Sequence, residues 1–208
     1  MQSKTRNAQQ SRRDILAAAE RIFGEKGFYG ARIDEIARAS GLNKQMIYVY
    51  YGSKEELYRQ VLVEIYHRME MVERELLETD LTGEALIAAI IDAYFRFLTN
   101  NPNFVNILMS ENLMHAQFLK QIPHEFIARQ TIDELSARID RSRDDGVFRE
   151  GIEGRRVIFT LITICFSNYS NRHTLSQLLS RDLEDEGFLQ ERKAAITDIM
   201  LSYLVKKP

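Results

Sequence analysis

Apolar residues recur every three or four positions along most of the chain, and no segment alternates strictly between apolar and polar residues. This spacing is typical of amphipathic α-helices, so the pattern predicts an all-α fold. Gly, Pro, Asn and Asp interrupt the pattern and mark the helix ends. The predicted helices are residues about 10–25, 33–39, 44–50, 53–76, 82–98, 101–113, 123–144, 154–169 and 188–205.

The two shortest predicted helices are separated by a tight turn. Ile33, Ile36 and Ala37 form one apolar stripe, and Gly41 suits the left-handed conformation that ends a helix. Asn43 can cap the next helix through its side-chain oxygen. A helix, a short turn with Gly and a second helix are typical of a helix-turn-helix DNA-binding motif, although many helical hairpins share this layout.

The second of these helices has two different faces. Ile47 can point toward the preceding helix, whereas Lys44, Gln45 and Tyr48 lie on the opposite side. Lys and Gln side chains can bind guanine and adenine edges in a major groove, and a Tyr hydroxyl can bind phosphate. Met46 lies between the two faces and could pack inward or touch a thymine methyl group. The alternative is an ordinary solvated polar face.

The segment from Gly41 to Leu57 resembles the signature of TetR-type transcriptional repressors, and the turn from Gly27 to Ala31 extends the resemblance. The signature is carried by Tyr48, Tyr50, Tyr51 and Ser53-Lys54. The resemblance implies a three-helix DNA-binding domain at residues 1–53 and a six-helix ligand-binding and dimerisation domain at 54–208. It also implies a regulator without enzymatic activity or cofactor, which binds a near-palindromic operator in double-stranded DNA as a dimer.

Arg32 departs from the family pattern, where Thr or Ser usually opens the second helix. Arg cannot cap a helix through an oxygen, but it can bind phosphate strongly. The residues expected to contact DNA are Arg32, Asn43, Lys44, Gln45, Met46, Tyr48, Tyr50 and Lys54.

The charge distribution supports this division of the chain. The net charge is −2 overall, yet residues 1–54 hold ten Lys and Arg against five Asp and Glu. The remaining residues are therefore acidic on balance. A basic N-terminal part on an acidic body is typical of a DNA-binding domain attached to a domain that does not contact DNA.

Composition limits the other classes of protein. The single cysteine, Cys165, cannot form an internal disulfide, and the polar N-terminus carries no secretory signal. The longest apolar run, from Val157 to Phe166, is too short to span a membrane. We therefore expect a cytoplasmic protein, with a buried and unreactive thiol.

The predicted helix at 154–169 is apolar on every side. Such a helix must be covered all round, and one subunit of this size can cover only one side. We therefore expect a homodimer through the helices at about 154–169 and 188–205, packed as a four-helix bundle across a two-fold axis.

A small hydrophobic or amphipathic effector, of a kind that the sequence does not identify, is expected to bind among the helices of the body and to release the DNA. The candidate wall residues, each of which could instead be solid core, are Met69, Phe104, Leu108, Glu111, Phe126, Phe159, Thr163 and Phe166.

Two other functions have partial support in the sequence. Glu64 and His67 have the spacing of a di-iron bundle ligand pair, but no second pair exists, so neither a metal-binding protein nor an all-helical enzyme is favoured. A helix-turn-helix regulator whose body binds a protein partner instead of a small molecule stays open.

Overall fold

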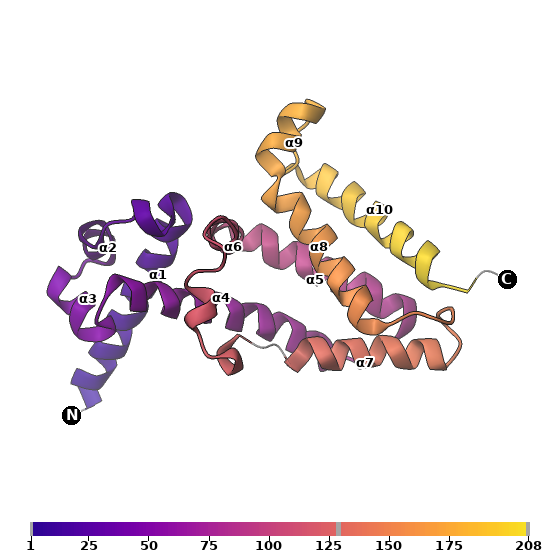
Figure 1. The fold of residues 1–208 in the computed structure, drawn as a ribbon, viewed down its shortest axis with the longest axis horizontal. Coiled ribbons are helices and arrows are strands. Elements are labelled where there is room, and N and C mark those ends of the chain that lie inside the picture. Colours follow the sequence, from indigo (N-terminus) through magenta and orange to yellow (C-terminus); the bar gives the residue numbers. More distant parts are fainter. Residues whose placement is uncertain (1, 128–129, 207–208) are drawn as a thin grey trace. The chain divides into compact units, whose positions relative to one another are not determined.

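The computed structural model describes residues 2–127 and 130–206, and in this part of the chain the secondary structure is helical apart from turns and one isolated bridge between Phe148 and Val205. The all-α prediction is confirmed. The contacts divide the chain into two compact units, which Figure 1 shows with their helices labelled. Unit 1 contains residues up to 67 together with 102–127, and unit 2 contains 68–101 together with 130–206.

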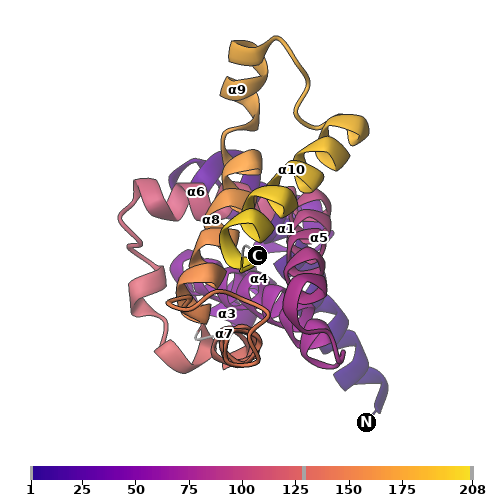
Figure 2. The same cartoon turned by 90° about the vertical axis from the view of Figure 1, so that its right-hand side faces the viewer.

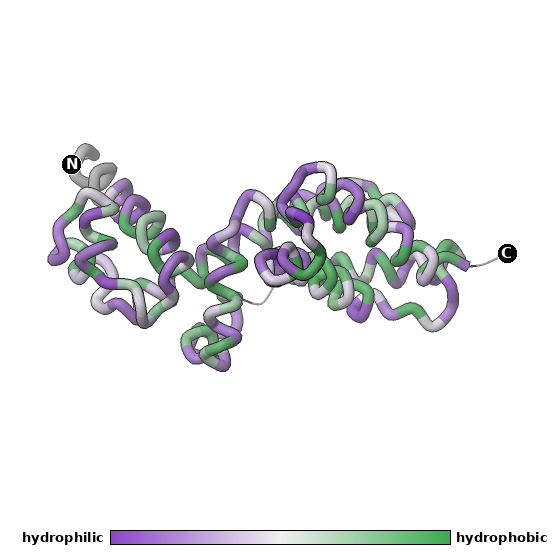
Figure 3. The backbone as a smooth tube through the Cα atoms, turned by 90° about the horizontal axis from the view of Figure 1, so that it is seen from above, coloured by the Kyte–Doolittle hydropathy of each residue, from purple (hydrophilic) through white to green (hydrophobic). Residues whose placement is uncertain are grey.

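Unit 1 combines the helices at the N-terminal end of the chain with a later segment. Its elements are α1 (Gln2–Gly30), α2 (Ile33–Ser40), α3 (Lys44–Tyr51), the first part of α4 (Lys54–Leu77), α6 (Pro102–Leu113), and the 3-10 turns η1 (Leu119–Gln121) and η2 (His124–Phe126). Helix α1 packs on both α2 and α6. Hydrophilic and hydrophobic stretches alternate along these helices, as expected when one side of each helix is buried (Figure 3).

Aromatic side chains form the centre of unit 1. Phe23 and Phe28 from α1 meet Tyr58 from α4 and Phe118 from the turn that precedes η1. The ring centroids lie 4.8 Å apart for Phe23 and Tyr58, and 4.2 Å apart for Phe28 and Phe118. Because Phe118 is distant in sequence from α1, α6 and the following turns are part of the core that supports the first helices.

Helix α1 begins earlier than the sequence predicts. It starts at Gln2, so Ser11 lies within the helix and is buried instead of capping its start. The predicted end near Gly27 corresponds to a break, because Gly27 adopts φ 66° and ψ 175°. Only Gly takes this conformation easily. The chain then makes one more short helical turn to Gly30.

Unit 2 is a bundle of longer helices. It contains the last part of α4 with α5 (Gly83–Asn100), α7 (Gln130–Asp144), α8 (Gly154–Ser170), α9 (Arg172–Leu179) and α10 (Glu186–Leu204). Helix α8 packs on α5 and α7, and α10 packs on α5. Figure 2 shows α9 at the far end of α8, away from the other helices of this unit.

Two sequence predictions were wrong in this part of the chain. The predicted helix at 123–144 begins only at Gln130, because the residues after Pro123 form the 3-10 turn η2 instead of an α-helix. Residues 128 and 129, which the predicted helix included, lie outside the described residues. The sequence analysis also missed α9, although Leu175, Leu178 and Leu179 have the i, i+3, i+4 spacing of a helical apolar stripe.

Helix α8 has one buried and one exposed side. Val157, Ile158, Leu161 and Cys165 are buried, whereas Phe159 keeps 71% of its surface exposed. Burial raises the pKa of the Cys165 thiol to about 12, so this thiol stays protonated and is a weak nucleophile at neutral pH. The expectation of a buried cysteine is confirmed.

Helices α7 and α8 meet at Gly154. Its N–H donates to the Asp140 carboxylate at 2.9 Å, so a side chain of α7 caps the start of α8. A Cβ atom on Gly154 would lie 2.1 Å from the carbonyl oxygen of Ser136, which belongs to the α7 backbone. The two backbones can therefore approach this closely only where α8 begins with Gly.

We expect Gly154→Ala to lower the free energy of unfolding by about 1–3 kcal/mol or more, because the added methyl group must push the two backbones apart. Urea unfolding followed by circular dichroism measures this change. Gly30→Ala is the matched control, since its nearest neighbour is the Lys26 Cβ at 3.3 Å and the position is exposed. An equally small effect of both substitutions would contradict the proposed close approach.

Candidate nucleic-acid interface

The turn between α2 and α3 has the geometry that the sequence predicted. Gly41 is left-handed at φ 69° and ends α2. The N–H of Leu42 donates to the Ala37 carbonyl at 3.1 Å. The Asn43 Oδ1 atom accepts a hydrogen bond from the Met46 N–H at 3.0 Å and so caps α3. These bonds fix the angle between the two helices, because both ends of the turn are satisfied by the backbone or by a cap.

The buried side of α3 orients its polar side. Ile47 is fully buried, and the Tyr51 hydroxyl donates to the Arg12 carbonyl oxygen at 2.8 Å, which ties α3 to α1. Lys44, Gln45 and Tyr48 are exposed on the other side, and Met46 is half-buried. The residues with hydrogen-bonding groups suited to base edges and phosphates therefore point outward together.

Lys44 carries an ion pair that the sequence analysis missed. Its Nζ lies 3.0 Å from the Asp34 carboxylate of α2, and both side chains are at least half exposed. The hydrogen bond with Asp34 raises the pKa of Lys44, so the ammonium group stays charged. Any DNA group that binds Lys44 competes with Asp34 for this charge. The feature of the sequence that could have predicted this ion pair is the acidic residue Asp34 in the first turn of α2.

Lys54 is held against an aromatic surface. Its Nζ lies 4.5 Å from the centroid of the Phe28 ring, and partial burial lowers the pKa of its ammonium group. Phe28 is itself buried in the aromatic core of unit 1. The cation is therefore positioned at the start of α4 by contact with this ring, instead of extending freely into solvent.

The start of α4 is capped, although not by a complete capping box. The Ser53 Oγ atom accepts from the Glu56 N–H at 3.0 Å. The Glu56 carboxylate accepts hydrogen bonds from Arg59, which lower its pKa, and no bond from Glu56 to the Ser53 N–H is present in the described part of the chain. The helix N-terminus next to Lys54 is consequently ordered and keeps the partial positive charge that attracts anions.

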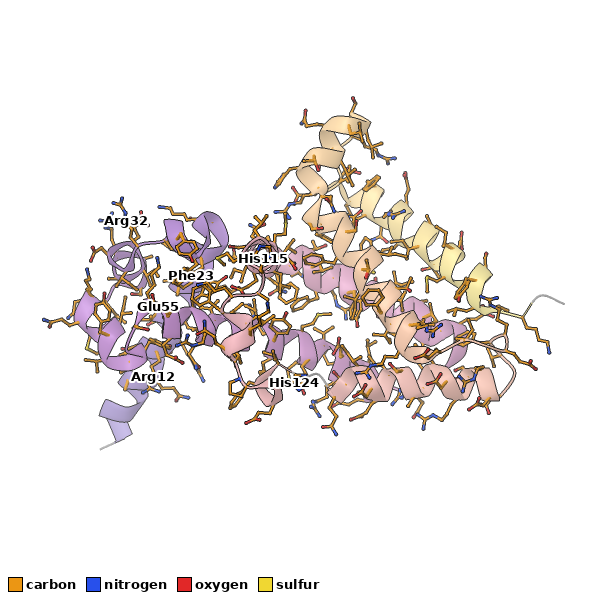
Figure 4. The ribbon with its side chains drawn as sticks, in the orientation of Figure 1. Arg12, Phe23, Arg32, Glu55, His115 and His124 are labelled. Carbon is orange, nitrogen blue, oxygen red and sulfur yellow. The ribbon has the colours of Figure 1, made fainter. Side chains whose placement is uncertain are left out.

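Arg32 and Tyr50 are the two remaining candidates for phosphate contacts. Arg32 occupies the cap position of α2 without any side-chain cap bond, as its chemistry predicts, and its side chain is exposed. The Arg12 guanidinium lies 5.3 Å from the centroid of the half-buried Tyr50 ring. Figure 4 shows the Arg12 and Arg32 side chains, which arise from α1 and from the start of α2. Both arginines can reach a phosphate without losing a buried contact.

The eight candidate effector residues are divided equally between the two units. In unit 1, Phe104 and Glu111 are buried, Leu108 is half-buried and Phe126 is 57% exposed. Phe126 lines a cavity of about 290 Å³ between α4 and the η1–η2 segment. In unit 2, the residues differ as widely in exposure. Met69 is buried, Phe166 is half-buried, and Phe159 and Thr163 are exposed on the outer side of α8.

Glu111 has a defined structural partner. Its Oε2 atom accepts from the Leu119 N–H at 3.0 Å, which ties the end of α6 to η1. Burial raises the pKa of the neighbouring Tyr58 hydroxyl, and the Glu111 carboxylate raises it further. The Glu111 carboxylate thus fixes the turn that carries Phe118, which is one of the four aromatic residues at the centre of unit 1.

A second buried carboxylate was missed by the sequence analysis. Glu73 of α4 is fully buried, and it accepts hydrogen bonds from the Tyr94 hydroxyl at 3.0 Å and the Thr131 hydroxyl at 2.5 Å. It joins α4, α5 and α7 within unit 2. The burial of Glu73 could have been predicted from its position on the apolar stripe of α4, between Met69 and Leu76, where a charged group needs buried partners.

Arg138 of α7 binds the other end of α4. Its guanidinium donates to the carbonyl oxygens of Leu76, Leu77 and Thr79. The last carbonyl groups of a helix have no partner within the helix, and a guanidinium can satisfy several of them at once. The end of α4 is therefore attached to α7, which packs on α8.

Within the residues that the structure describes, no helix is long and apolar enough to cross a membrane.

Comparison with known proteins identifies both parts of the chain. Residues 15–61 match the family described as "Bacterial regulatory proteins, tetR family", and residues 84–200 match "Tetracyclin repressor-like, C-terminal domain". The chain is 32% identical over 205 residues to the transcriptional repressor NicS of Pseudomonas putida, which covers 95% of this chain and 94% of NicS. It is 26% identical over 162 residues to the repressor SCO4008 of Streptomyces coelicolor, covering 76% of this chain and 78% of the relative.

Solved structures agree on the fold. The ketosteroid transcriptional regulator KstR2 of Mycobacterium tuberculosis superposes with a TM-score of 0.69 at 17% identity, covering 94% of this chain and 95% of KstR2. The fatty acid degradation regulator FadR of Bacillus halodurans gives a TM-score of 0.68 at 16% identity, covering 89% and 94%. The chain belongs to the TetR family of transcriptional regulators, and it is a helix-turn-helix DNA-binding protein and not an enzyme.

Proposed function

We propose that this chain is a cytoplasmic repressor that binds a near-palindromic operator as a homodimer and is released by a small hydrophobic or amphipathic effector. Regulators of this family bind DNA operators, usually as dimers and with small-molecule effectors. The similarity to the repressor NicS favours repression. The observation that carries the proposal is the outward polar side of α3, held in place by buried Ile47 and by the Asn43 cap.

In this proposal Lys44, Gln45 and Met46 read base edges in the major groove. Arg32, Tyr48, Tyr50 and Lys54 position the domain on phosphates, and Asn43 supports both sets by capping α3. Residues 1–53 contact DNA, and residues 54–208 bind the effector and form the dimer. Two such domains related by a two-fold axis can meet successive major grooves about 34–36 Å apart.

The dimer contact is proposed to involve α8 and α10. Phe159 of α8 and Ile199 and Tyr203 of α10 keep 71%, 58% and 53% of their surfaces exposed in the single chain. Large apolar side chains gathered on two neighbouring helices are typical of a surface that a second subunit covers. A two-fold axis would bring two copies of each helix into a four-helix bundle.

The proposed transmission of the effector signal runs through α4. This helix has 24 residues, and it begins in unit 1 and continues into unit 2. At a rise of 1.5 Å per residue it spans roughly 36 Å. Both of its ends are attached, by the Ser53 cap and by the Arg138 guanidinium. A displacement of α7 would therefore move the end of α4. To change occupancy from 99:1 to 1:99, an effector must favour the released state by roughly 5.5 kcal/mol.

We expect Gln45→Ala to weaken binding to an operator, selected from random duplexes with the wild-type protein, by about 1–3 kcal/mol, because a bidentate amide contact is lost. Fluorescence anisotropy with this operator measures the change. Gln190→Ala, an exposed amide on α10, is the matched control. Unchanged affinity of the Gln45 variant, with its dimer intact, would refute the role of α3 in base recognition.

Lys54→Ala should weaken binding evenly across sequences and reduce the slope of log K against log salt by about one, because one phosphate contact is lost. Titrations at several salt concentrations, on the operator and on unrelated duplexes, test this expectation. Lys206→Ala provides an exposed lysine control in unit 2. A change in sequence preference instead of slope would contradict the phosphate role.

Asp34→Asn should increase DNA affinity by a few-fold at low salt, because it releases Lys44 from its ion pair and removes a negative charge next to the DNA surface. The gain should fall as salt is added. Asp34→Glu keeps the charge and serves as the control. A loss of affinity in the Asn variant, with helicity preserved, would show that Asp34 positions Lys44 for binding instead of competing with DNA.

A further inference from the structure

The segment that follows α8 is a small arm with a defined internal structure. We use the name arm for residues 171–185, which comprise α9 and the loop that returns to α10. Figures 1 and 2 show α9 standing off the end of α8 in both views. Helix α9 is not among the predicted helices, and its contacts with the neighbouring segments determine what the arm can do.

The inner side of the arm is fixed by several contacts. Arg172 is buried, its Nη1 donates to the Tyr169 carbonyl at 2.9 Å, and its Nε lies 3.1 Å from the Glu184 carboxylate. Leu183 is buried, and its N–H donates to the Ser176 hydroxyl at 3.2 Å. These contacts attach the return loop both to α9 and to the end of α8, so the arm has a defined conformation.

The arm is also attached to α10. Arg181 forms an ion pair with Glu191 at 2.8 Å and lies 4.8 Å from the centroid of the Phe188 ring. With both of its ends held, the arm presents its remaining side to solvent. That side carries Leu178 and Leu179, which keep 77% and 57% of their surfaces exposed.

Single exposed leucines are ordinary on a protein surface. Two adjacent exposed leucines on an anchored arm form a small apolar patch of the kind that a binding partner can cover. The arm continues directly from α8 and leads into α10, the two helices whose exposed apolar side chains form the proposed dimer contact. The surface of the arm is thus continuous with that contact. The partner that this continuity favours is a second copy of the same chain.

Two-fold symmetry decides which part of the second copy the arm can meet. If the axis crosses α8 near its middle, the end of α8 in one subunit lies beside the start of α8 in the other. The start of α8 and the end of α10 carry exposed Phe159 and Tyr203 in each chain. The Phe159 ring and the face of the Tyr203 ring that the Arg149 guanidinium, 4.1 Å from its centroid, leaves open each offer an apolar surface for Leu178 and Leu179.

The charges favour the same arrangement. The loop of the arm and the start of α10 are acidic, with Asp182, Glu184, Asp185 and Glu186. The first turn of α8 carries Arg155 and Arg156, whose side chains are 72% and 83% exposed and hold only surface ion pairs, with Asp133 and Glu153. An arrangement that brought the two arms together would place acidic loops against each other, whereas the opposite end offers cations.

We propose that the arm clasps the second subunit of the dimer. Its leucines pack on Phe159 and Tyr203 of the partner subunit, and its acidic loop faces Arg155 and Arg156 of the partner subunit. The inference rests on the proposed dimerisation through α8 and α10, and it adds to that contact an exchanged element outside the four-helix bundle. Each dimer contains two such contacts, because the interface is isologous.

The double variant Leu178→Ser with Leu179→Ser tests the clasp. Sedimentation equilibrium should show that the dimer dissociation constant rises roughly tenfold or more, because four leucine side chains per dimer lose apolar burial. Leu113→Ser is the matched control, since Leu113 is 82% exposed in unit 1. A double variant with helicity and a dissociation constant like those of the wild type would overturn the inference.

Ile199→Ser separates this inference from the proposed dimer, because Ile199 of α10 belongs to the proposed dimer contact and not to the clasp. A wild-type protein that is monomeric at micromolar concentration would refute the dimer itself. If Ile199→Ser weakens the dimer while the double leucine variant does not, the contact through α8 and α10 stands and the clasp is wrong.

Charge reversal tests the orientation. Arg156→Glu and Glu186→Arg should each weaken the dimer at low salt, and the two together should restore most of the lost affinity, because each subunit then carries the reversed pair. Absence of any restoration would contradict the placement of the acidic loop beside the start of α8.

Discussion

The attachment of α4 at both ends is the constraint on which the rest of this structure depends. Its first turn is capped by Ser53 next to the DNA-binding helices, and its last carbonyl groups are bound by Arg138 of α7. A helix resists bending and stretching because each residue is hydrogen-bonded along the axis. In the proposed mechanism α4 carries a displacement along its axis, which a flexible linker of the same length could not do.

Buried carboxylates reinforce this arrangement within each unit. Glu111 holds the turn that completes the aromatic core behind the DNA-binding helices, and Glu73 joins α4 to α5 and α7. A buried carboxylate is costly unless its oxygens are hydrogen-bonded, so each of these residues specifies one arrangement of its neighbours. Substitution of one of their hydrogen-bonding partners should therefore be strongly destabilising, because it leaves a buried charge without a partner in apolar surroundings.

The proposed DNA-binding surface is organised by contacts within the protein. Lys44 is paired with Asp34, Lys54 lies on the Phe28 ring and Arg12 lies over the Tyr50 ring. In each case a cation has a weak partner that a phosphate or a base can replace. These contacts limit the conformations of long side chains before DNA binds, which reduces the entropy lost on binding.

The sequence by itself determined the all-α fold, the caps at Asn43 and Ser53, the inward position of Ile47 and the outward polar side of α3. These features follow from local chemistry, because hydrophobic spacing, cap side chains and a left-handed Gly act over a few residues. Apolar spacing also located most helices, although Phe126 and Ile127 lie outside any α-helix, since the chain after Pro123 forms a 3-10 turn.

Only the tertiary structure decided the features that join residues distant in the chain. The Asp34 partner of Lys44, the position of Lys54 on Phe28, the buried Glu73 and the Arg138 contacts all depend on which helices become neighbours. Helix α9 is the clearest case, because Leu178 and Leu179 stay exposed in the single chain and the position of the helix is fixed by Arg172 and the returning loop. Such elements are stabilised by packing between distant parts of the chain, and local sequence patterns do not predict that packing.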